Sequence, residues 1–192
     1  IAGIAKAKNL PALEVMYDLL VTNQGKELFY QPLGFYNNYN LDETRRIMQH
    51  PNILMGLSDG GAHCNVIADA GMPTFILTHW GRDRTKGDTL PLEFLVRSLT
   101  RSTAEAYDMM DRGLLKAGML ADINIIDFAQ LRLFRPEAVF DLPTAAKRLV
   151  QRVQGYDYTI KSGKITFEQS QHTGALPGVL LRGAQQPKTA KQ

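Results

Sequence analysis

The chain has 192 residues, of which 44% are hydrophobic and 21% charged, and its formal net charge is +3. This length and composition suit one large or two small globular domains with a sizeable core. The single cysteine, Cys64, excludes an internal disulfide framework, fits a reducing compartment and predicts a cytoplasmic location. No apolar run is long enough to span a membrane, no signal-peptide layout is present, and the scattered basic residues do not predict nucleic-acid binding.

The first sixty residues alternate between predicted helices and strands. The apolar spacing of residues 10–21 predicts a helix, and residues 27–33 predict a strand. Residues 41–49 predict a second helix with Asp42 as its cap, and the apolar run 53–57 predicts a buried strand. This alternation is typical of an α/β protein with a parallel sheet.

Two loops are predicted around these elements. Residues 34–40 form an aromatic and Asn-rich loop whose Tyr36 and Tyr39 suit either a pocket lining or surface packing. Residues 58–89 show no regular pattern except at 74–78. A loop of this length inside a compact domain is uncommon and usually functional.

The pattern changes near residue 111. Before it, residues 90–100 predict a helix capped by Thr89, and Ser102 caps a short helix that follows. After it, the predicted elements are mostly β: a strand at 121–128, a hairpin at 156–168 with glycine in its turn, and a last strand at 179–182. We therefore expect two domain portions, residues 1–111 and residues 112–192.

Asp59 directly follows the predicted strand 53–57, at the kind of position where α/β folds gather catalytic groups. Gly60 and Gly61 let the chain turn away sharply and leave the carboxylate uncrowded. Two interpretations stay open. Asp59 either ligates a metal or acts as a general base toward bound water, or it accepts backbone N–H groups in a tight turn.

Two histidines follow in the same stretch. His63 and His79 could orient a substrate carbonyl or stabilise an oxyanion, but for each taken singly a hydrogen-bonded structural role is favoured. Cys64 is expected to be a buried and inert thiol. The spacing of these residues does not indicate an autonomous zinc site.

Two arginines flank an aspartate just after the only tryptophan, Trp80. A guanidinium binds a carboxylate bidentately, so Arg82 and Arg84 suit a substrate that carries an acid group. The alternative is an ion pair within the stretch, such as Arg82 with Asp83.

Three segments, in this order, resemble the amidohydrolase superfamily, specifically its N-acyl-D-amino-acid deacylase (D-aminoacylase) branch. They are Gly-Leu-Ser-Asp-Gly-Gly-Ala-His at 56–63, Leu-Thr-His-Trp-Gly-Arg-Asp-Arg at 77–84 followed by Leu-Pro-Leu-Glu at 90–93, and residues 111–127. The third segment resembles the entry into a small β domain that is shared widely across the superfamily. The resemblance covers nearly the whole chain.

The resemblance implies that this chain is a C-terminal fragment. It would hold the last two strands and helices of a (β/α)8 barrel (TIM barrel) and part of a small β-sandwich domain. One or two divalent metals, usually zinc, would activate a water that attacks an amide. Asp59 matches the aspartate that takes the proton from that water, passes it to the leaving amine and can also contact the metal. His63, His79, Arg82 and Arg84 match positions expected to bind the N-acyl amino acid substrate, with an arginine on its carboxylate.

The other metal ligands of the family, including its His-x-His pair, are not in this sequence. We therefore expect that the chain needs a missing N-terminal barrel portion, and that alone it binds metal weakly and hydrolyses no amide. Two alternatives stay open: a non-catalytic, split-gene subunit that completes another chain's barrel, and a hydantoinase-like activity on cyclic amides. A homo-oligomer is also left open.

Overall fold

A computed structural model describes residues 1–187 except 32–33, 35, 37–38 and 57–58. The chain divides into two compact units, residues 1–43 and 44–192, which are described separately. The division predicted near residue 111 stays a prediction. Within the described ranges, no helix combines the length and the apolar character needed to cross a membrane.

The described part of the first unit includes the helices α1 (Ala2–Lys8) and α2 (Ala12–Gly25). The helix predicted at 10–21 is confirmed. It begins directly after Pro11, at a position where a backbone N–H would have no partner within the helix, so proline loses no hydrogen bond there. The predicted apolar face is not buried within this unit, since Leu13 is 76% and Tyr17 65% exposed. The predicted face is therefore only partly covered, whereas Val15 of the same helix is buried at 2% exposure.

The strand predicted at 27–33 is not formed over residues 27–31, and residues 32–33 lie outside the described residues. A strand needs a neighbouring strand to bond to, and the described part of this unit contains none. Tyr36 and Tyr39 contact each other edge to face, with ring centroids 6.3 Å apart. Tyr39 is 77% exposed, which favours the surface interpretation for that side chain.

Helix α3 (Asp42–Met48) confirms the helix predicted at 41–49. Asp42, the expected cap, is the first residue of this helix, and the side chain of Asn40 accepts its backbone N–H at 3.1 Å. The apolar run that follows is not a strand over residues 53–56, and Ile53 is 45% exposed. Residue 57 lies outside the described residues.

The long loop predicted at 58–89 contains a helix that was not predicted beyond residues 74–78. Three consecutive stretches form it: η2 (Asp69–Gly71), α4 (Met72–Phe75) and the π-helical η3 (Ile76–Asp83). The backbone N–H of Arg84 donates to the carbonyl of His79, five residues earlier, at 3.0 Å. π-Helical stretches are rare and often occur at functional sites. The residues singled out from His79 to Asp83 therefore lie on a helix and not in a loop.

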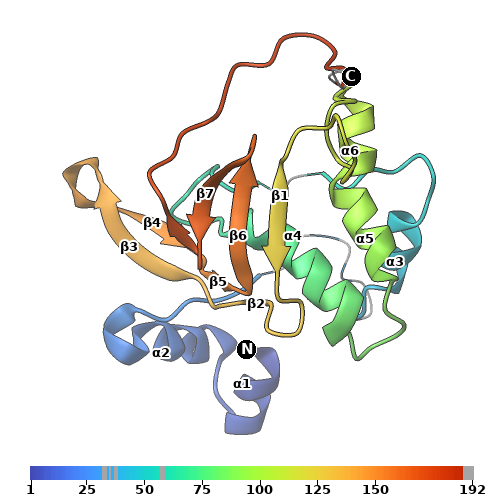
Figure 1. Cartoon of the computed structure of the whole chain (residues 1–192). Coiled ribbons are helices and arrows are strands. Elements are labelled where there is room, and N and C mark those ends of the chain that lie inside the picture. The colour runs from blue at the N-terminus through green and yellow to red at the C-terminus, as the bar shows by residue number, and fades with distance from the viewer. Residues whose placement is uncertain (32–33, 35, 37–38, 57–58, 188–192) are drawn as a thin grey trace. The chain divides into compact units, whose positions relative to one another are not determined.

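Helices α5 (Leu92–Leu99) and α6 (Arg101–Ala106) confirm the two helices predicted before residue 111. Neither has the expected side-chain cap: Pro91 precedes α5, and Ser102 lies inside α6. Leu95 of α5 is completely buried. In Figure 1 both helices lie beyond the edge of the sheet that β1 forms.

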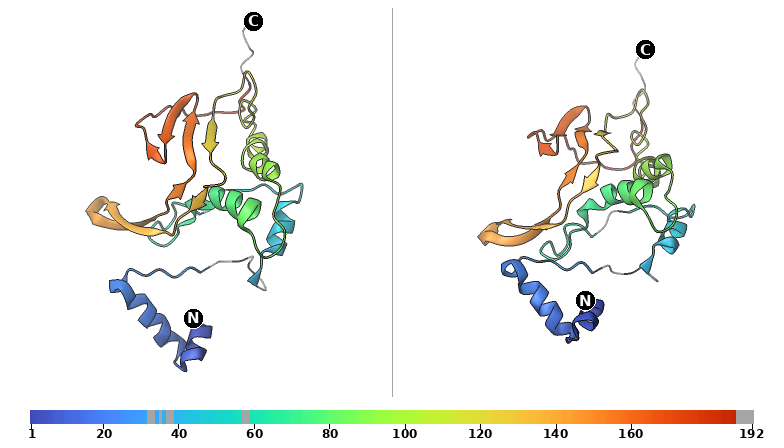
Figure 2. Two further views of the ribbon diagram at one scale, coloured as in Figure 1. Left: turned by 60° about the horizontal axis from the view of Figure 1, so that its bottom comes forward. Right: turned by 90° about the horizontal axis from the view of Figure 1, so that it is seen from below.

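Within the described residues, the named strands all lie between residues 123 and 172, in the part that the sequence predicted to be mostly β, and an isolated parallel bridge joins Met109 and Gln185. The main sheet has four antiparallel strands in the order β1-β6-β7-β8, and two further pairs are β2-β5 and β3-β4. Their bounds are β1 (Ile123–Ile126), β2 (Arg132–Leu133), β3 (Glu137–Leu142), β4 (Ala146–Val150), β5 (Val153–Gln154), β6 (Tyr156–Lys161), β7 (Lys164–Glu168) and β8 (Gln171–His172), with a 3₁₀ turn η4 (Pro143–Ala145). Figure 2 shows the β3-β4 hairpin extending away from the main sheet.

Two predictions for this part are confirmed and one is wrong. Strand β1 falls inside the predicted 121–128. The hairpin β6-β7 turns at Ser162 and Gly163, which both have positive φ angles of 51° and 78°. Such a two-residue turn matches the twist of the strands. Residues 179–182 form no strand.

The helix at 69–83 packs on the β structure along its length. At its start, a side chain on Gly71 would lie 2.6 Å from Leu133 of β2. In its middle, the hydroxyls of Thr74 and Tyr156 of β6 are 2.9 Å apart and hydrogen-bonded. This helix therefore joins the helical and β parts of the second unit.

Asp122 anchors the start of the main sheet. Its carboxylate accepts Lys161 Nζ at 2.9 Å and the backbone N–H of Ser162 at 2.8 Å, and Arg112 lies 3.4 Å away. Burial alone would raise the pKa of this carboxyl, but its bonds to Lys161 and Ser162 outweigh burial and lower the pKa. The ionised carboxylate of Asp122 is therefore the form favoured at this position.

Candidate functional site

Asp59 lies exposed at the start of a tightly wound turn. Its carbonyl accepts the backbone N–H of Ala62 at 3.1 Å, while no described residue donates a hydrogen bond to its carboxylate. Gly61 has a φ angle of +97°, and a Cβ on Gly60 would lie 2.9 Å from the backbone nitrogen of Ala70. Gly61 is therefore needed for its positive φ, and Gly60 is needed because a side chain would clash with Ala70. Both glycines leave the carboxylate of Asp59 open to solvent.

His63 continues the same turn with a left-handed φ of 43°. Its carbonyl accepts the backbone N–H groups of Val66 at 2.8 Å and Ile67 at 3.0 Å. The next residue, Cys64, is partly buried, and its carbonyl accepts the backbone N–H of Leu149 in β4 at 2.7 Å. The turn that carries Asp59 and His63 is thus fixed by close packing on η2 and by a hydrogen bond to β4.

His79 lies on η3 among aromatic rings. Its imidazole stacks on Phe75, with centroids 4.8 Å apart and planes at 7°, and meets Trp80 edge to face at 5.0 Å. Within the described residues, its buried Nε2 has no hydrogen-bond partner. Burial, and then the positive charge of Arg84, lower the pKa of His79, while Asp83 opposes them. The neutral imidazole is therefore favoured in the folded chain.

We expect the nuclear magnetic resonance signals of His79 to titrate below its ordinary pKa of 6.5. A folded state that resists protonation binds fewer protons than the unfolded chain. The stability associated with His79 is therefore complete above pH 6.5 and falls as the pH drops through 6.5 toward the pKa of the folded protein.

The His79→Gln variant assigns the signal, and the indole N–H signal of Trp80 should move with the same midpoint because the two rings touch. His63→Gln is the matched control, since it removes an exposed imidazole and should leave this titration unchanged. A midpoint at or above 6.5 for His79 would contradict the expectation.

Arg82 and Asp83 form the ion pair that the sequence left as an alternative. Arg82 Nε donates to Asp83 Oδ1 at 2.6 Å, and a terminal nitrogen donates to Oδ2 at 3.0 Å. This bidentate bond lowers the pKa of Asp83 and raises that of Arg82. Arg82 also donates to backbone carbonyls of residues 128, 129 and 131.

Arg84 is buried to 7% exposure at the end of η3. Its guanidinium lies over the indole of Trp80, 4.8 Å from the ring centroid, and one nitrogen donates to the carbonyl of Asp88 at 2.8 Å. A substrate role for either arginine stays a prediction. To perform it, Arg82 would have to release Asp83 or a carbonyl group.

The predicted site residues fall on two elements. Asp59 and His63 share the exposed turn, whereas the other three, His79, Arg82 and Arg84, lie on or beside η3. Among the described residues, no group of three or more His, Cys, Asp or Glu side chains is arranged to hold a metal ion. The donor set required for zinc is thus not supplied by this part of the chain.

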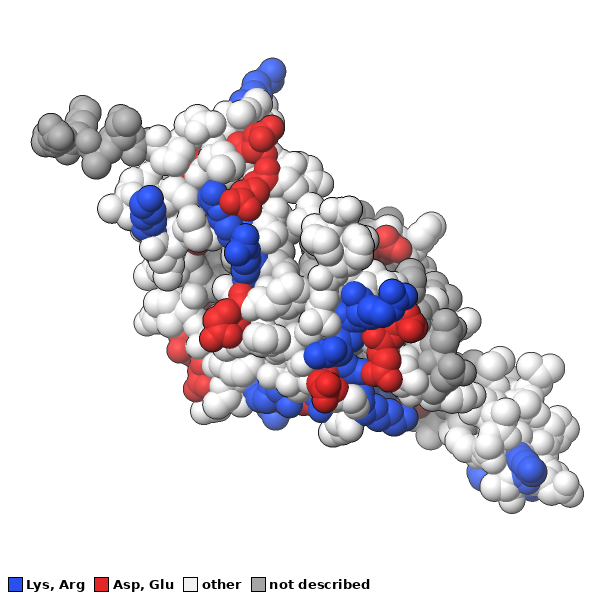
Figure 3. Space-filling view, turned by 90° about the vertical axis from the view of Figure 1, so that its right-hand side faces the viewer, with Lys and Arg blue, Asp and Glu red and all other residues white. Residues whose placement is uncertain are grey.

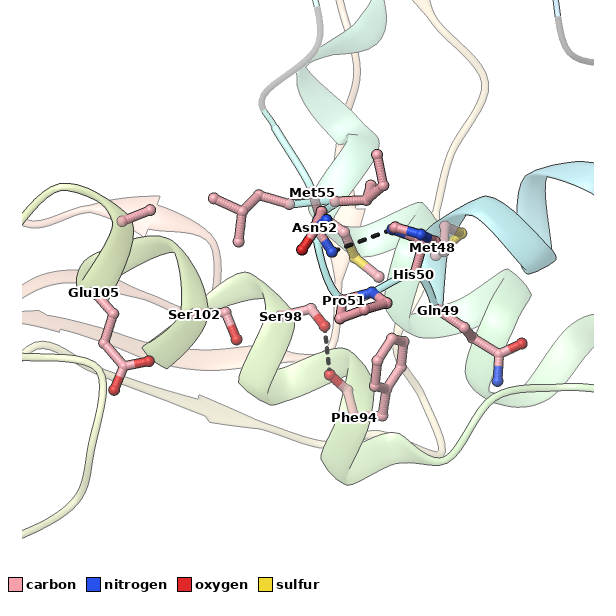
Figure 4. A pocket seen from close by; sticks show the side chains of 13 residues that line it. Met48, Gln49, His50, Pro51, Asn52, Met55, Phe94, Ser98, Ser102 and Glu105 are labelled. Carbon is pink, nitrogen blue, oxygen red and sulfur yellow. Dashed lines mark hydrogen bonds between the residues drawn. The ribbon is translucent and has the colours of Figure 1, made fainter.

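A groove of about 580 Å³ lies elsewhere, between the segment after α3 and the helices α5 and α6 (Figure 4). Its polar groups include His50, whose Nδ1 accepts the backbone N–H of Asn52 at 3.2 Å, and Ser98, which donates to the carbonyl of Phe94 at 2.8 Å. None of the predicted site residues lines it. Sequence reasoning missed this groove, because its two walls are at least 39 residues apart in the sequence and no motif marks them.

Charged side chains of both signs are interspersed on the face shown in Figure 3. A nucleic-acid site would be expected to show a continuous basic patch. This face therefore offers no basic patch of that kind.

Comparison with known proteins gives one match. A family model described as the amidohydrolase family matches residues 2–167. No curated protein and no solved structure matches the chain.

Proposed function

The chain belongs to the amidohydrolase family, and from this premise we propose that it is part of a hydrolase that removes the acyl group from N-acyl-D-amino acids. Family membership over residues 2–167 indicates a hydrolase, and members of this family commonly use divalent metals. The finer reaction is supported by the order of the three motifs around residues 56–63, 77–93 and 111–127.

The observation that carries the proposal is the open carboxylate of Asp59 on a turn that is fixed on both sides. An ionised carboxylate can take a proton from the water that attacks an amide carbonyl. The same group can then give that proton to the nitrogen as the C–N bond breaks, which yields a carboxylic acid and an amine. His63, exposed on the same turn, is proposed to contact the substrate.

A divalent metal does not fit the described residues alone, because they offer no group of three ligands. No step is therefore assigned to a metal here. If the reaction uses zinc, we propose that most of its ligands come from other protein segments, with Asp59 as the one possible ligand from this turn.

We further propose that the described residues 27–31 and 53–56 join strands when a barrel is completed by such segments. Their apolar side chains support this: Leu28 and Phe29 are 41% and 42% exposed, and Ile53 and Leu54 are 45% and 49% exposed. Extended apolar segments without neighbours leave both backbone groups and side chains uncovered. The same exposure favours the second candidate function, a non-catalytic subunit that completes the barrel of another chain.

The test compares this chain with the gene product that contains it, each with and without added zinc. The substrates are N-acetyl-D-amino acids, their L-enantiomers and a hydantoin. We expect the chain alone to bind zinc weakly and to release no acetate, whereas the gene product hydrolyses the D-enantiomers. Zinc-dependent deacylation by this chain as a folded monomer would overturn the incomplete-site proposal. Cleavage of the hydantoin alone would replace the proposed substrate, and an inactive gene product with a co-purifying barrel partner would favour the subunit.

A further inference from the structure

Arg82 stands out because every donor of its guanidinium is used within the chain. An arginine side chain has five N–H groups. Two of these groups donate to the carboxylate of Asp83, at 2.6 and 3.0 Å. The other three donate to the carbonyls of Phe128, Ala129 (3.1 Å) and Leu131 (2.7 Å). No donor is left for a substrate carboxylate.

The three carbonyls belong to the segment between β1 and β2, residues 127–131. This segment is tied to the rest of the β structure by the backbone N–H of Asp127, which donates to Gly155 at 2.9 Å. The Arg82 guanidinium also lies 5.4 Å from the centroid of the Phe128 ring. A Cβ on Gly81 would lie 3.2 Å from Leu95 and 3.4 Å from the Phe128 ring, so this part of η3 packs closely on both side chains.

Asp83 sets the direction of the guanidinium. Because the aspartate occupies one edge of the planar group, the remaining N–H groups are directed at the segment 127–131. The pair sits at the end of the helical stretch that carries His79 and Trp80. A lysine could not reproduce this arrangement, because an ammonium group is a point charge without the planar fork.

We propose that Arg82 is a positioning residue, not a substrate ligand, and that it fixes the end of η3 to the segment 127–131 of the β part. His79 lies on the same η3 stretch, three residues before Arg82, so loss of these bonds would loosen the helix end that carries it. This inference does not depend on the proposed function. The interaction is supported by five hydrogen bonds between groups 1 to 49 residues apart in the sequence.

The test is the Arg82→Lys variant, which keeps the charge and removes the fork. We expect amide hydrogen exchange in residues 127–131 to become about tenfold faster, since hydrogen bonds to charged groups are among the stronger ones. The emission of Trp80, the only tryptophan and 2% exposed, should shift to the red as water reaches the helix end. The pKa of His79 should rise toward its ordinary 6.5 as its burial decreases.

Arg97→Lys is the matched control, because Arg97 is an exposed arginine in the last turn of α5. It should change none of these measurements. If Arg82→Lys speeds exchange throughout the chain, including the hairpin 156–168, the milder Asp83→Asn variant is used to distinguish local loosening from general unfolding. In that variant, exchange should become faster at 127–131 and stay unchanged in the hairpin. Unchanged exchange at 127–131 in either folded variant overturns the proposal. None of these measurements uses hydrolysis, so an inactive protein with the expected exchange contradicts only the proposed function.

Discussion

Replacing Asp59 with asparagine is expected to slow amide hydrolysis by the gene product by about 10²–10⁴-fold, the range typical of a general acid–base group. Asparagine has nearly the shape of aspartate and fits the same turn, so the packing of Gly60 on Ala70 should persist. It cannot take up a proton from water at neutral pH. The measurement is steady-state turnover of an N-acetyl-D-amino acid, together with the zinc content of the purified variant.

The matched control is Asp88→Asn, which changes another exposed aspartate of the same unit. It should keep normal turnover, because the backbone carbonyl of Asp88 and not its side chain contacts Arg84. Normal turnover in the Asp59→Asn variant would remove Asp59 from the mechanism. Lost turnover with lost zinc would instead assign Asp59 to metal binding.

Local signals were enough to predict several elements of the fold. The apolar spacing at 10–21, 41–49 and 90–100 predicted helices that are present, and glycine in a two-residue turn predicted the hairpin β6-β7. The same reasoning failed at 27–33 and 53–57, where the described residues form no strand. A helix satisfies its own backbone, whereas a strand depends on a neighbour that a local pattern does not specify.

The helix at 69–83 was missed for a different reason. Its sequence contains Gly71 and Gly81 together with β-branched residues, all of which have low helix propensity. Burial against β2, β6 and Leu95 outweighs this preference. Pro73 in the first turn of α4 was the one local sign of a helix start.

In the candidate site, too, local features could be predicted from the sequence and long-range contacts could not. The geometry of the Asp59 turn could be predicted in part, because adjacent glycines indicate a sharp change of direction and Gly61 does have a positive φ. The five bonds of Arg82 could not be predicted, since three of them reach carbonyls 46 to 49 residues away. Only the two bonds to the adjacent Asp83 could be predicted from the sequence.

Replacing Gly155 with alanine is expected to cost about 3–5 kcal/mol of folding free energy, a large part of the stability of a typical domain. Gly155 has a φ angle of +96°, and a Cβ there would lie 2.6 Å from Cα and 2.8 Å from the nitrogen of Leu131. Those atoms are backbone and cannot rotate away. Leu131 is completely buried and its carbonyl accepts a hydrogen bond from Arg82, so relief of the clash would disturb both the core and the segment 127–131.

The Gly174→Ala variant separates the cost of a left-handed backbone from the cost of the clash with Leu131. Gly174 has a similar φ of +87°, but an added Cβ would meet no atom within 4 Å. The free energy of unfolding of that variant should therefore fall only by the cost of a left-handed backbone, about 1–2 kcal/mol. Urea unfolding followed by circular dichroism measures both variants. A Gly155→Ala variant no less stable than Gly174→Ala would show that the close approach of Gly155 to Leu131 is not needed for folding, whereas a large excess cost would locate that cost in the contact between the two backbones.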